Sequence, residues 1–132
     1  MQKGGMLNSA VAKVLADLGH TDTIVIADCG LPVPDGVPKI DLALKPGAPS
    51  FIEVLEEVAK NMVIEKVEIA AEMKEKNPDV YKAMKELFTA EQWIADENHE
   101  AFKIATKKAK CVIRTGEITP FANVILHSNV FF

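Results

Sequence analysis

Two periods of apolar residues alternate along this chain, and together they predict a mixed α/β fold. Apolar positions three and four residues apart, which are typical of one face of a helix, recur in residues 9–18, 51–62, 78–88 and 98–109. Short apolar or alternating runs, which are typical of strands, fall at 24–27, 39–44, 63–71, 92–97, 111–115 and 122–127. We therefore expect a three-layer α/β/α sandwich around a mostly parallel sheet of about six strands.

Residues at the expected helix ends support these boundaries. Asn8 is a suitable cap for the first helix, and Gly19 fits a left-handed position just after its end. Ser50 with Glu53 forms a capping box for the second helix. Pro78 suits the first position of the third helix, because its missing N–H is not needed there.

The composition is that of an ordinary globular chain. Hydrophobic residues make up 48% of the 132 residues and charged residues 26%, which is typical of a domain with a proper core. No repeat, linker or low-complexity segment interrupts the pattern, so we expect a single domain over residues 1–132. The net charge of −4 argues against nucleic acid as a partner. No apolar run approaches a membrane span and residues 1–7 show no signal peptide, so we expect a cytoplasmic protein.

Polar side chains flank the most apolar strand of the chain, which covers residues 24–27. His20 and Asp22 precede this strand, and Asp28 follows it, before a segment rich in glycine and proline. Polar groups at the ends of a strand in a rigid scaffold are typical of small-molecule sites. These three side chains are therefore candidate functional residues.

Each histidine and aspartate also has a structural interpretation, which the sequence leaves open. His20 and His99 both lie at helix ends, where a histidine often interacts only with the helix terminus. Asp22 and Asp28 are also typical of turns, because an aspartate there accepts hydrogen bonds from its own backbone. His127 lies in an apolar run, which favours a packing role.

Other polar residues are equally open to two interpretations. Arg114 lies in an otherwise apolar strand and needs a partner if it is buried, either a structural carboxylate or a ligand. Glu117, beside Gly116, fits a plain loop carboxylate. Cys29 and Cys111 form no spacing for a metal or redox site, so we expect reduced thiols with a packing role.

Motifs for cofactor chemistry are absent from the chain. It contains no P-loop, no dinucleotide-binding glycine pattern, no HExxH and no paired CxxC. The histidines and aspartates have no diagnostic metal spacing, and no two histidines share a helix face. We therefore expect neither a cofactor nor a metal.

Several short segments, taken together, resemble the ribose pyranase and fucose mutarotase family. The segments are LGHTD at 18–22, DCGLPVP at 28–34, IRTGE at 113–117 and PFAN at 120–123. No single segment is specific, but their joint occurrence is. The resemblance covers the chain from Asn8 to its C-terminus.

The resemblance implies an enzyme that interconverts β-D-ribopyranose and β-D-ribofuranose by acid/base ring opening and supplies furanose for ribose catabolism. It implies no cofactor and D-ribose as the partner. It implies that His20 is the catalytic acid/base residue. The residues that it implies as sugar contacts are Asp28, His99, Phe121, Ala122 and Asn123. The family commonly has Tyr where this chain has Phe121, so a hydroxyl is missing here.

The chemistry of these residue types agrees with the implied reaction. Ring interconversion passes through an open-chain aldehyde, so a proton must reach the ring oxygen and another must leave the anomeric hydroxyl. A histidine can do both in turn, because its imidazole titrates near neutral pH. Asp28 either accepts hydrogen bonds from sugar hydroxyls or orients the imidazole, and the sequence leaves both roles open.

The resemblance also implies a ring-like homo-oligomer, a pentamer or a decamer of stacked rings, with sites between subunits. The chain ends in Phe131 and Phe132, which would forgo about 1.5–3 kcal/mol of burial each if left in water. They can pack on their own core. The resemblance instead favours docking of this tail on a neighbour, which would bring Asn123 near His20 and Asp28 of the adjacent chain.

Two other functions are alternatives to ribose isomerisation. One is a mutarotase for another sugar such as L-fucose, which exchanges anomers and not ring sizes. The other is a sugar-binding or assembly protein without catalysis, in which loss of His20 leaves binding intact and there is no turnover to lose.

Overall fold

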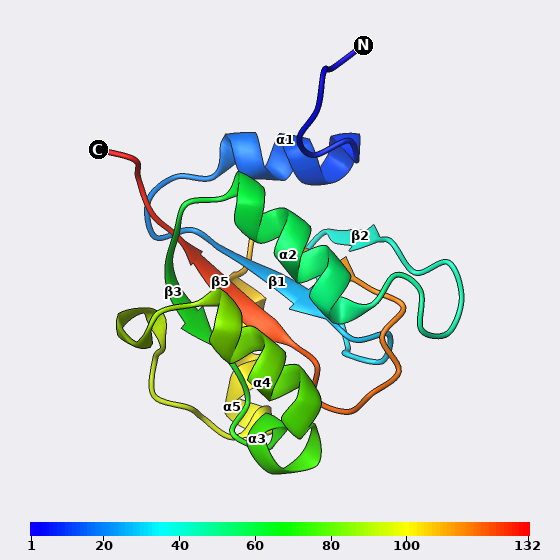
Figure 1. The fold of residues 1–132 in the computed structure, drawn as a ribbon, viewed down its shortest axis with the longest axis vertical. Coiled ribbons are helices and arrows are strands. Elements are labelled where there is room, and N and C mark those ends of the chain that lie inside the picture. Colours follow the sequence, from blue (N-terminus) through cyan, green and yellow to red (C-terminus); the bar gives the residue numbers. More distant parts are fainter.

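The computed structural model describes residues 1–132, with one five-stranded sheet and helices on both of its faces (Figure 1). The strands lie in the order β2, β4, β1, β5, β3, so β1 is central. Their bounds are Thr23–Ala27 for β1, Lys39–Asp41 for β2, Ile64–Glu68 for β3, Val112–Arg114 for β4 and Val124–Ser128 for β5.

Strand β5 runs against every other strand of the sheet. β1 pairs in parallel with β4, and β4 with β2, whereas β5 pairs antiparallel with both β1 and β3. Four strands therefore point one way, in agreement with the expected mostly parallel sheet. The antiparallel pairing also fixes which loops meet, because the beginning of β5 lies beside the end of β1.

The expected count of about six strands is wrong, because residues 92–97 form no strand. The 3-10 helix η1 (Ala90–Gln92) includes the first of them, and a capping box closes that turn. After it the chain touches the neighbouring segment only through isolated bridges at Trp93 and Glu97. Two single bridges separated by an irregular path do not make a sixth strand.

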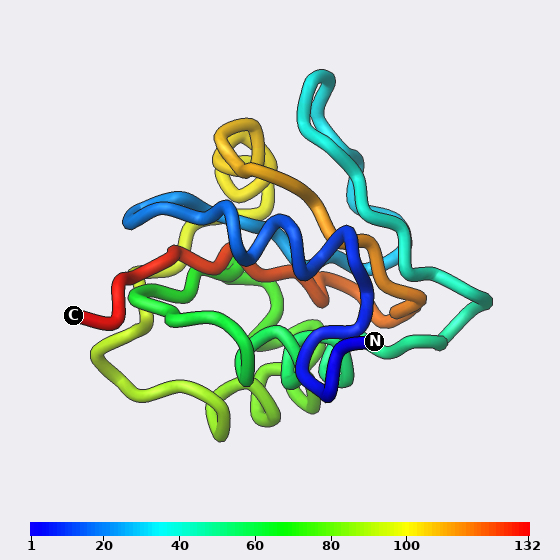
Figure 2. The backbone as a smooth tube through the Cα atoms, turned by 90° about the horizontal axis from the view of Figure 1, so that it is seen from above, coloured from blue at the N-terminus to red at the C-terminus, as the bar shows by residue number.

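The helices divide between the two faces of the sheet (Figures 1 and 2). One face carries α1 (Ser9–Asp17), α2 (Phe51–Asn61) and α4 (Pro78–Leu87), with the short α3 (Met73–Lys76) beside α4. The other face carries α5 (His99–Ala105), which continues into the 3-10 helix η2 (Thr106–Lys108).

Alternation along β1 contributes to two separate hydrophobic cores. Ile24 and Ile26 belong to a cluster of 18 buried residues under α1, α2 and α4. Val25 and Ala27 belong to a cluster of 8 around Phe102 of α5. Because successive strand residues point to opposite faces, an unbroken apolar run needs cover on both faces. The helices on the two sides provide it.

The predicted helix start residues are confirmed, although at Ser50 only one of the two hydrogen bonds of the expected capping box forms. Asn8 caps α1, because its side chain accepts a backbone N–H three residues on at 3.0 Å. Ser50 caps α2 in the same way at 3.1 Å, and Pro78 occupies the first turn of α4. These local hydrogen bonds form within a few residues, so the sequence pattern is sufficient to predict them.

Two predicted boundaries are wrong. The left-handed residue after α1 is Thr21, with φ of 71°, and not Gly19. Gly19 instead donates its N–H to Asp22 Oδ2 at 2.9 Å, which closes the connection to β1 as a turn. The second strand ends at Asp41 and not at residue 44, because the Asp41 carboxylate accepts the N–H two residues on and turns the chain.

Two buried polar side chains fix the loop between β4 and β5. Glu117 accepts the Phe51 N–H at 3.0 Å and the Thr119 N–H at 3.2 Å, and so helps to cap α2 from the loop after β4. The Asn77 amide donates to the Thr119 hydroxyl and to the Pro120 carbonyl, both at 2.8 Å. The loop that leads into β5 is therefore held from both α2 and α4.

We expect Glu117→Gln to lower the free energy of unfolding. Burial acts to raise the pKa of Glu117, but the accepted hydrogen bonds, from the Phe51 N–H first, outweigh burial and hold the pKa below the ordinary 4.5. A carboxylate with a lowered pKa stabilises the fold above its ordinary pKa and loses that contribution as pH falls through the lowered one. Denaturant unfolding at neutral pH is expected to show a loss of about 1–3 kcal/mol.

The matched control for this variant is Glu56→Gln, on the exposed side of α2. The wild-type protein is expected to lose stability more steeply below pH 4.5 than the Glu117→Gln variant, because only the wild type gains that proton on unfolding. Parallel stability curves for the two proteins in this range would contradict the assignment.

Candidate functional site

Asp28 and Asn123 exchange two hydrogen bonds at one end of the central strand. Asn123 Oδ1 accepts the Asp28 N–H at 2.9 Å, and Asn123 Nδ2 donates to Asp28 Oδ2 at 2.9 Å. Asp28 Oδ1 accepts the Gly30 N–H at 2.9 Å, so Asp28 also closes the turn after β1. Each carboxylate oxygen can accept a second hydrogen bond. Asp28 is thus a turn residue, and its fixed carboxylate keeps the capacity to accept further hydrogen bonds.

Phe121, in the loop before β5, holds a strained backbone next to this pair. Its φ of 57° lies in the left-handed region, which a bulky residue seldom adopts. Strain of this kind costs about 1–3 kcal/mol and is concentrated at functional sites. The Phe121 ring meets the His99 ring edge-on, with centroids 5.1 Å apart. Ala122 follows and is completely buried, so it supports the loop and presents no open surface.

His99 is the first residue of α5, and two side chains fix that helix start. Asn98 accepts the Ala101 N–H at 2.9 Å, and Glu72 Oε1 accepts the His99 N–H at 3.1 Å. The hydrogen bond from the His99 N–H lowers the pKa of Glu72 below its ordinary value. His99 Nδ1 and Glu72 Oε2 are buried without a hydrogen-bond partner. Unpaired buried atoms are rare in native proteins, so this pair is a candidate ligand contact.

The structure brings together four of the residues that the sequence singles out, and leaves His20 apart from them. We call Asp28, His99, Phe121 and Asn123 the Asp28 cluster. His20 precedes β1, whereas the cluster lies beyond its far end. The four residue steps of β1 alone span about 13 Å. Asp28 therefore cannot orient the imidazole of His20 within one chain. Of the two roles that the sequence leaves open for Asp28, only that of a hydrogen-bond acceptor for the sugar remains within one chain.

The expectation that Asn123 reaches Asp28 of an adjacent chain is wrong. Asn123 pairs with Asp28 of its own chain and not of a neighbour, because β5 is antiparallel to β1. The tail follows the other end of β5, on the side of His20. Phe131 and Phe132 are 90% and 96% exposed, so the alternative that they pack on their own core is also wrong.

His20 lies in a tight turn and faces a carboxylate. The turn is closed by the Asp22 N–H, which donates to the Gly19 carbonyl at 3.2 Å. The Thr21 N–H anchors it to the end of β5. The imidazole is 50% exposed, and its Nε2 lies 3.4 Å from Glu65 Oε2. An accessible imidazole on a fixed turn suits proton transfer.

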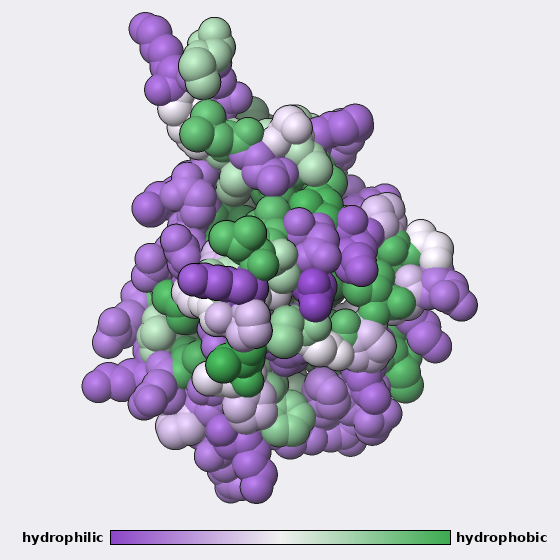
Figure 3. Space-filling view, turned by 90° about the vertical axis from the view of Figure 1, so that its right-hand side faces the viewer, coloured by the Kyte–Doolittle hydropathy of each residue, from purple (hydrophilic) through white to green (hydrophobic).

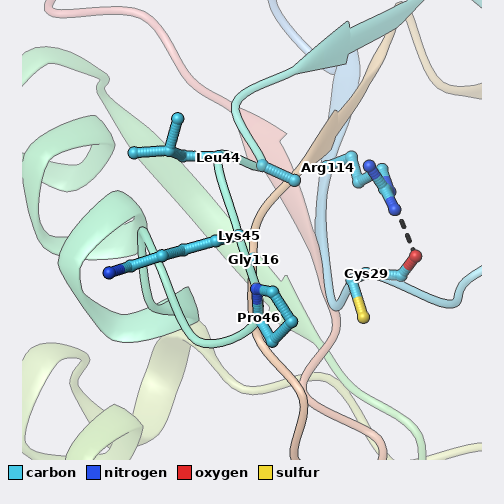
Figure 4. Close-up of a pocket in the computed structure, with 7 residues that line it drawn as sticks. Cys29, Leu44, Lys45, Pro46, Arg114 and Gly116 are labelled. Carbon is cyan, nitrogen blue, oxygen red and sulfur yellow. Dashed lines mark hydrogen bonds between the residues drawn. The ribbon is translucent and has the colours of Figure 1, made fainter.

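A hollow of about 210 Å³ lies beside Cys29, but its charged side chains are not free for a ligand (Figure 4). Arg114 Nε donates to the Cys29 carbonyl at 3.0 Å, and the guanidinium pairs with Asp41 at 3.1 Å. Lys45 points away from the hollow. Arg114 is therefore a structural ion-pair residue, one of the two interpretations that the sequence left open.

The expected packing role is confirmed for Cys111 in the larger hydrophobic core, whereas His127 contacts a carboxylate and Cys29 lies outside both cores. His127 Nε2 lies 3.2 Å from Glu68 Oε2. Cys111 is fully buried, and burial raises the pKa of its thiol to about 11. Cys29 is half-buried and forms no disulfide. No three His, Cys, Asp or Glu side chains gather closely enough to hold a metal ion, and no helix is both long and apolar enough to span a membrane.

Sequence reasoning missed two carboxylates, Glu65 and Glu72. Both lie in a segment rich in Glu and Lys, where charged residues are usually solvated surface. Their contacts with His20 and with the His99 backbone join distant parts of the chain, the latter 27 positions apart. No spacing rule covers contacts that depend on strand order.

Comparison with known proteins identifies the family. The model of the RbsD / FucU transport protein family matches residues 1–131. The chain belongs to this family. A D-ribose pyranase of Bacillus cereus is 58% identical over 132 residues, and a D-ribose pyranase of Exiguobacterium sibiricum is 56% identical over 132 residues. In both cases this chain and the relative are covered completely.

Solved structures of family members share the fold. The structure of Bacillus subtilis RbsD complexed with D-ribose matches with a TM-score of 0.96 and 58% identity, over 100% of both chains. The fucose mutarotase from Streptococcus pneumoniae in complex with L-fucose matches with a TM-score of 0.80 over 96% of this chain and 95% of that one. Because this second protein is only 21% identical to the chain, the comparison with it shows a shared fold and nothing more.

We expect a double-mutant cycle to show that Asp28 and Asn123 stabilise the fold as a unit. Asp28→Ala, Asn123→Ala and the double variant are compared by denaturant unfolding. Because both single changes remove the hydrogen bond from Asn123 Nδ2 to Asp28 Oδ2, the coupling free energy is expected to be about 0.5–3 kcal/mol. Asp28→Ala combined with Glu56→Ala, on the distant exposed face of α2, is the control and is expected to be additive. Additivity of the Asp28 and Asn123 variants would contradict a stabilising bond between the two side chains.

Proposed function

We propose that this protein interconverts β-D-ribopyranose and β-D-ribofuranose by acid/base ring opening without a cofactor, and so supplies furanose for ribose catabolism. The observation that carries the proposal is the full-length likeness to RbsD complexed with D-ribose, at 58% identity and a TM-score of 0.96. The D-ribose pyranases of Bacillus cereus and Exiguobacterium sibiricum support it at the same level. The cytoplasmic location expected from the sequence stays a prediction.

The Asp28 cluster has the groups that a sugar requires. Sugar recognition needs convergent polar partners beside an apolar surface. The Asp28 carboxylate accepts hydrogen bonds from hydroxyls, the His99 imidazole donates or accepts one, and the Phe121 ring supplies the apolar face. Asn123 is 1% exposed, and both ends of its amide bind Asp28. We therefore assign Asn123 to holding Asp28 in place.

His20 carries out the proton transfers in this proposal. Opening the pyranose breaks the bond between the anomeric carbon and the ring oxygen, which takes up a proton while the anomeric hydroxyl loses one. Another hydroxyl then adds to the aldehyde and closes the furanose, with the two proton transfers reversed. An imidazole serves as acid and base in turn, and such catalysis contributes about 10²–10⁴-fold.

A second copy of the chain has to bring His20 to the Asp28 cluster. The two lie beyond opposite ends of β1, which alone spans about 13 Å. A contact in which the His20 end of one copy covers the Asp28 cluster of the next is heterologous, and such contacts close into rings when the rotation allows it. We therefore propose a ring-like homo-oligomer, a pentamer or a decamer of two stacked rings, with sites between subunits.

Exposed apolar side chains support such a contact. Phe131 and Phe132 lie beyond the His20 end of the sheet, and Ile118 lies in the loop that precedes Phe121 and is 65% exposed. Figure 3, which views the molecule from the β2 side, shows separate apolar patches among polar surface. Burying each large apolar side chain contributes about 1.5–3 kcal/mol, so covering several of them would stabilise an assembly.

Two rival functions differ from the proposed one in their substrate or in their need for His20. A mutarotase for L-fucose has support from the shared fold, but the Streptococcus pneumoniae protein is 21% identical, against 58% for RbsD. A sugar-binding protein without catalysis would use the Asp28 cluster and have no need of His20. Substrate choice and the effect of His20 therefore separate the three.

The proposed function is tested by magnetisation-transfer NMR on equilibrated D-ribose. The wild-type protein is expected to speed exchange between the β-pyranose and β-furanose signals, with a metal chelator present. His20→Ala is expected to abolish that acceleration while leaving the thermal melt nearly unchanged, because the side chain is half exposed. Cys29→Ala and Cys111→Ala are the controls and are expected to stay within about a few-fold of the parent.

Three outcomes would contradict the proposal. Exchange at the rate of buffer alone would exclude ribose isomerisation. Faster anomer exchange of L-fucose than ring-size exchange of D-ribose would favour the mutarotase. Full exchange by His20→Ala would mean that another group, such as His99 or a carboxylate, transfers the proton.

Shared sites are tested by mixing two inactive variants. His20→Ala and Asp28→Ala are each expected to be inactive, and their mixture is expected to regain part of the activity, because some interfaces then combine an intact His20 with an intact Asp28. Deleting residues 130–132 is expected to lower both the assembly size by light scattering and the activity. No complementation despite proven subunit exchange would place the whole site in one chain. A truncated monomer with full activity would likewise contradict the shared site.

A further inference from the structure

Glu65 is the carboxylate that the structure places against His20. Its Oε2 lies 3.4 Å from His20 Nε2, within ion-pair distance, and its side chain makes no hydrogen bond and no other ion pair. The two side chains keep 50% and 37% of their surface exposed, so neither is held by burial in a core. Glu65 has no structural partner that would explain its position.

Other acidic side chains near the His20 turn have partners of their own. Asp22 accepts the Gly19 N–H at 2.9 Å and faces Lys110 at 3.6 Å. Asp17 pairs with Lys13 one helical turn away. Glu65 is therefore the acid in this region whose contact is with the imidazole.

A bulge in β3 explains how Glu65 comes to face His20. The register between β3 and β5 pairs Ile64 with Ser128 and Lys66 with His127. Two steps on β3 thus match one step on β5, and Glu65 is the extra residue. Bulges re-aim a side chain and are frequent next to active sites. The Ser128 carbonyl also binds the turn that carries His20, so the bulge and the turn meet at the same end of β5.

The contact has a chemical consequence for the imidazole. A carboxylate can only accept a hydrogen bond, so a neutral imidazole that contacts it through Nε2 carries its proton there. The other nitrogen, Nδ1, is then the one left to exchange protons with a ligand. When His20 takes up a second proton, the carboxylate offsets the positive charge of the imidazolium, as in other histidine and carboxylate pairs.

We propose that Glu65 is a positioning residue for His20, which fixes the Nε2–H tautomer, presents Nδ1 to the sugar and offsets the charge of the imidazolium. This proposal rests on the proposed function for the assignment of His20 as the acid/base residue. It adds a carboxylate that reaches the reaction only through His20. The bulge in β3 is the feature of the fold that places it.

The test compares Glu65→Gln with Asp17→Asn, which makes the same change of charge three residues before His20. For Glu65→Gln, ribose exchange is expected to show kcat lowered by about tenfold, less than the 10²–10⁴ of a whole acid/base group, with KM within about twofold. In the same samples, ¹⁵N NMR of His20 is expected to change from one Nε2–H tautomer to a mixture. Asp17→Asn is expected to match the wild type in all three measurements, and all melts are expected to be similar.

A second comparison tests Glu65→Gln in a protein that lacks the His20 imidazole. His20→Ala is expected to leave ribose exchange at the rate of buffer alone, so the melt is the measurement that decides in this background. Adding Glu65→Gln there is expected to leave the melt unchanged, because the carboxylate acts only through the imidazole. A lower melting temperature on adding Glu65→Gln would give Glu65 a structural role of its own and overturn the proposal.

The tautomer measurement keeps this proposal separate from the proposed function. An unchanged His20 tautomer in Glu65→Gln overturns the positioning role, whether or not ribose is the substrate. A changed tautomer with unchanged kcat overturns the catalytic consequence. If wild-type protein does not speed ribose exchange at all, the proposed function fails, and the tautomer result still decides whether Glu65 fixes the ring.

Discussion

The antiparallel pairing of β5 with β1 is the constraint on which the site depends. It sets the beginning of β5 beside the end of β1, and so lets Asn123 and Asp28 exchange two hydrogen bonds across 95 positions of sequence. The same pairing sets the end of β5 beside the beginning of β1, where the His20 turn binds Ser128. The direction of this one strand therefore builds both ends that we propose to be functional, and keeps them a strand length apart.

Rigid support surrounds the end that we assign to the sugar. The loop into β5 is held by the buried Glu117 and Asn77, and the start of α5 is held by Glu72. This network lets Phe121 keep a left-handed backbone that costs about 1–3 kcal/mol. A sugar has many hydroxyls and little apolar surface, so its recognition depends on acceptors that do not move. The buried hydrogen bonds of Glu117, Asn77 and Glu72 therefore lie around the cluster that has to stay rigid.

The proposed acid/base end is built differently. His20 and Glu65 are both partly exposed, and only a turn and a bulge hold them. An exposed ion pair is weak in water, but it gains strength when a neighbouring surface excludes solvent. In the assembly that we propose, the next subunit provides that surface together with the sugar cluster. Assembly and catalysis would then be linked, since the acid/base pair becomes effective only where the sugar is bound.

Local sequence patterns predict the helices and the central strand. The caps at Asn8 and Ser50 and the apolar run of β1 act over a few residues, so local patterns predict them. The polar residues that flank β1 already singled out His20 and Asp28, and the resemblance gave them roles and added the loop at Phe121. The three-dimensional structure was needed to show that Asn123 holds Asp28 within one chain, that residues 92–97 form no strand, and that Glu65 and Glu72 contact histidines. These contacts depend on strand order, direction and a bulge, which arise from long-range packing and leave no periodic signal in the sequence.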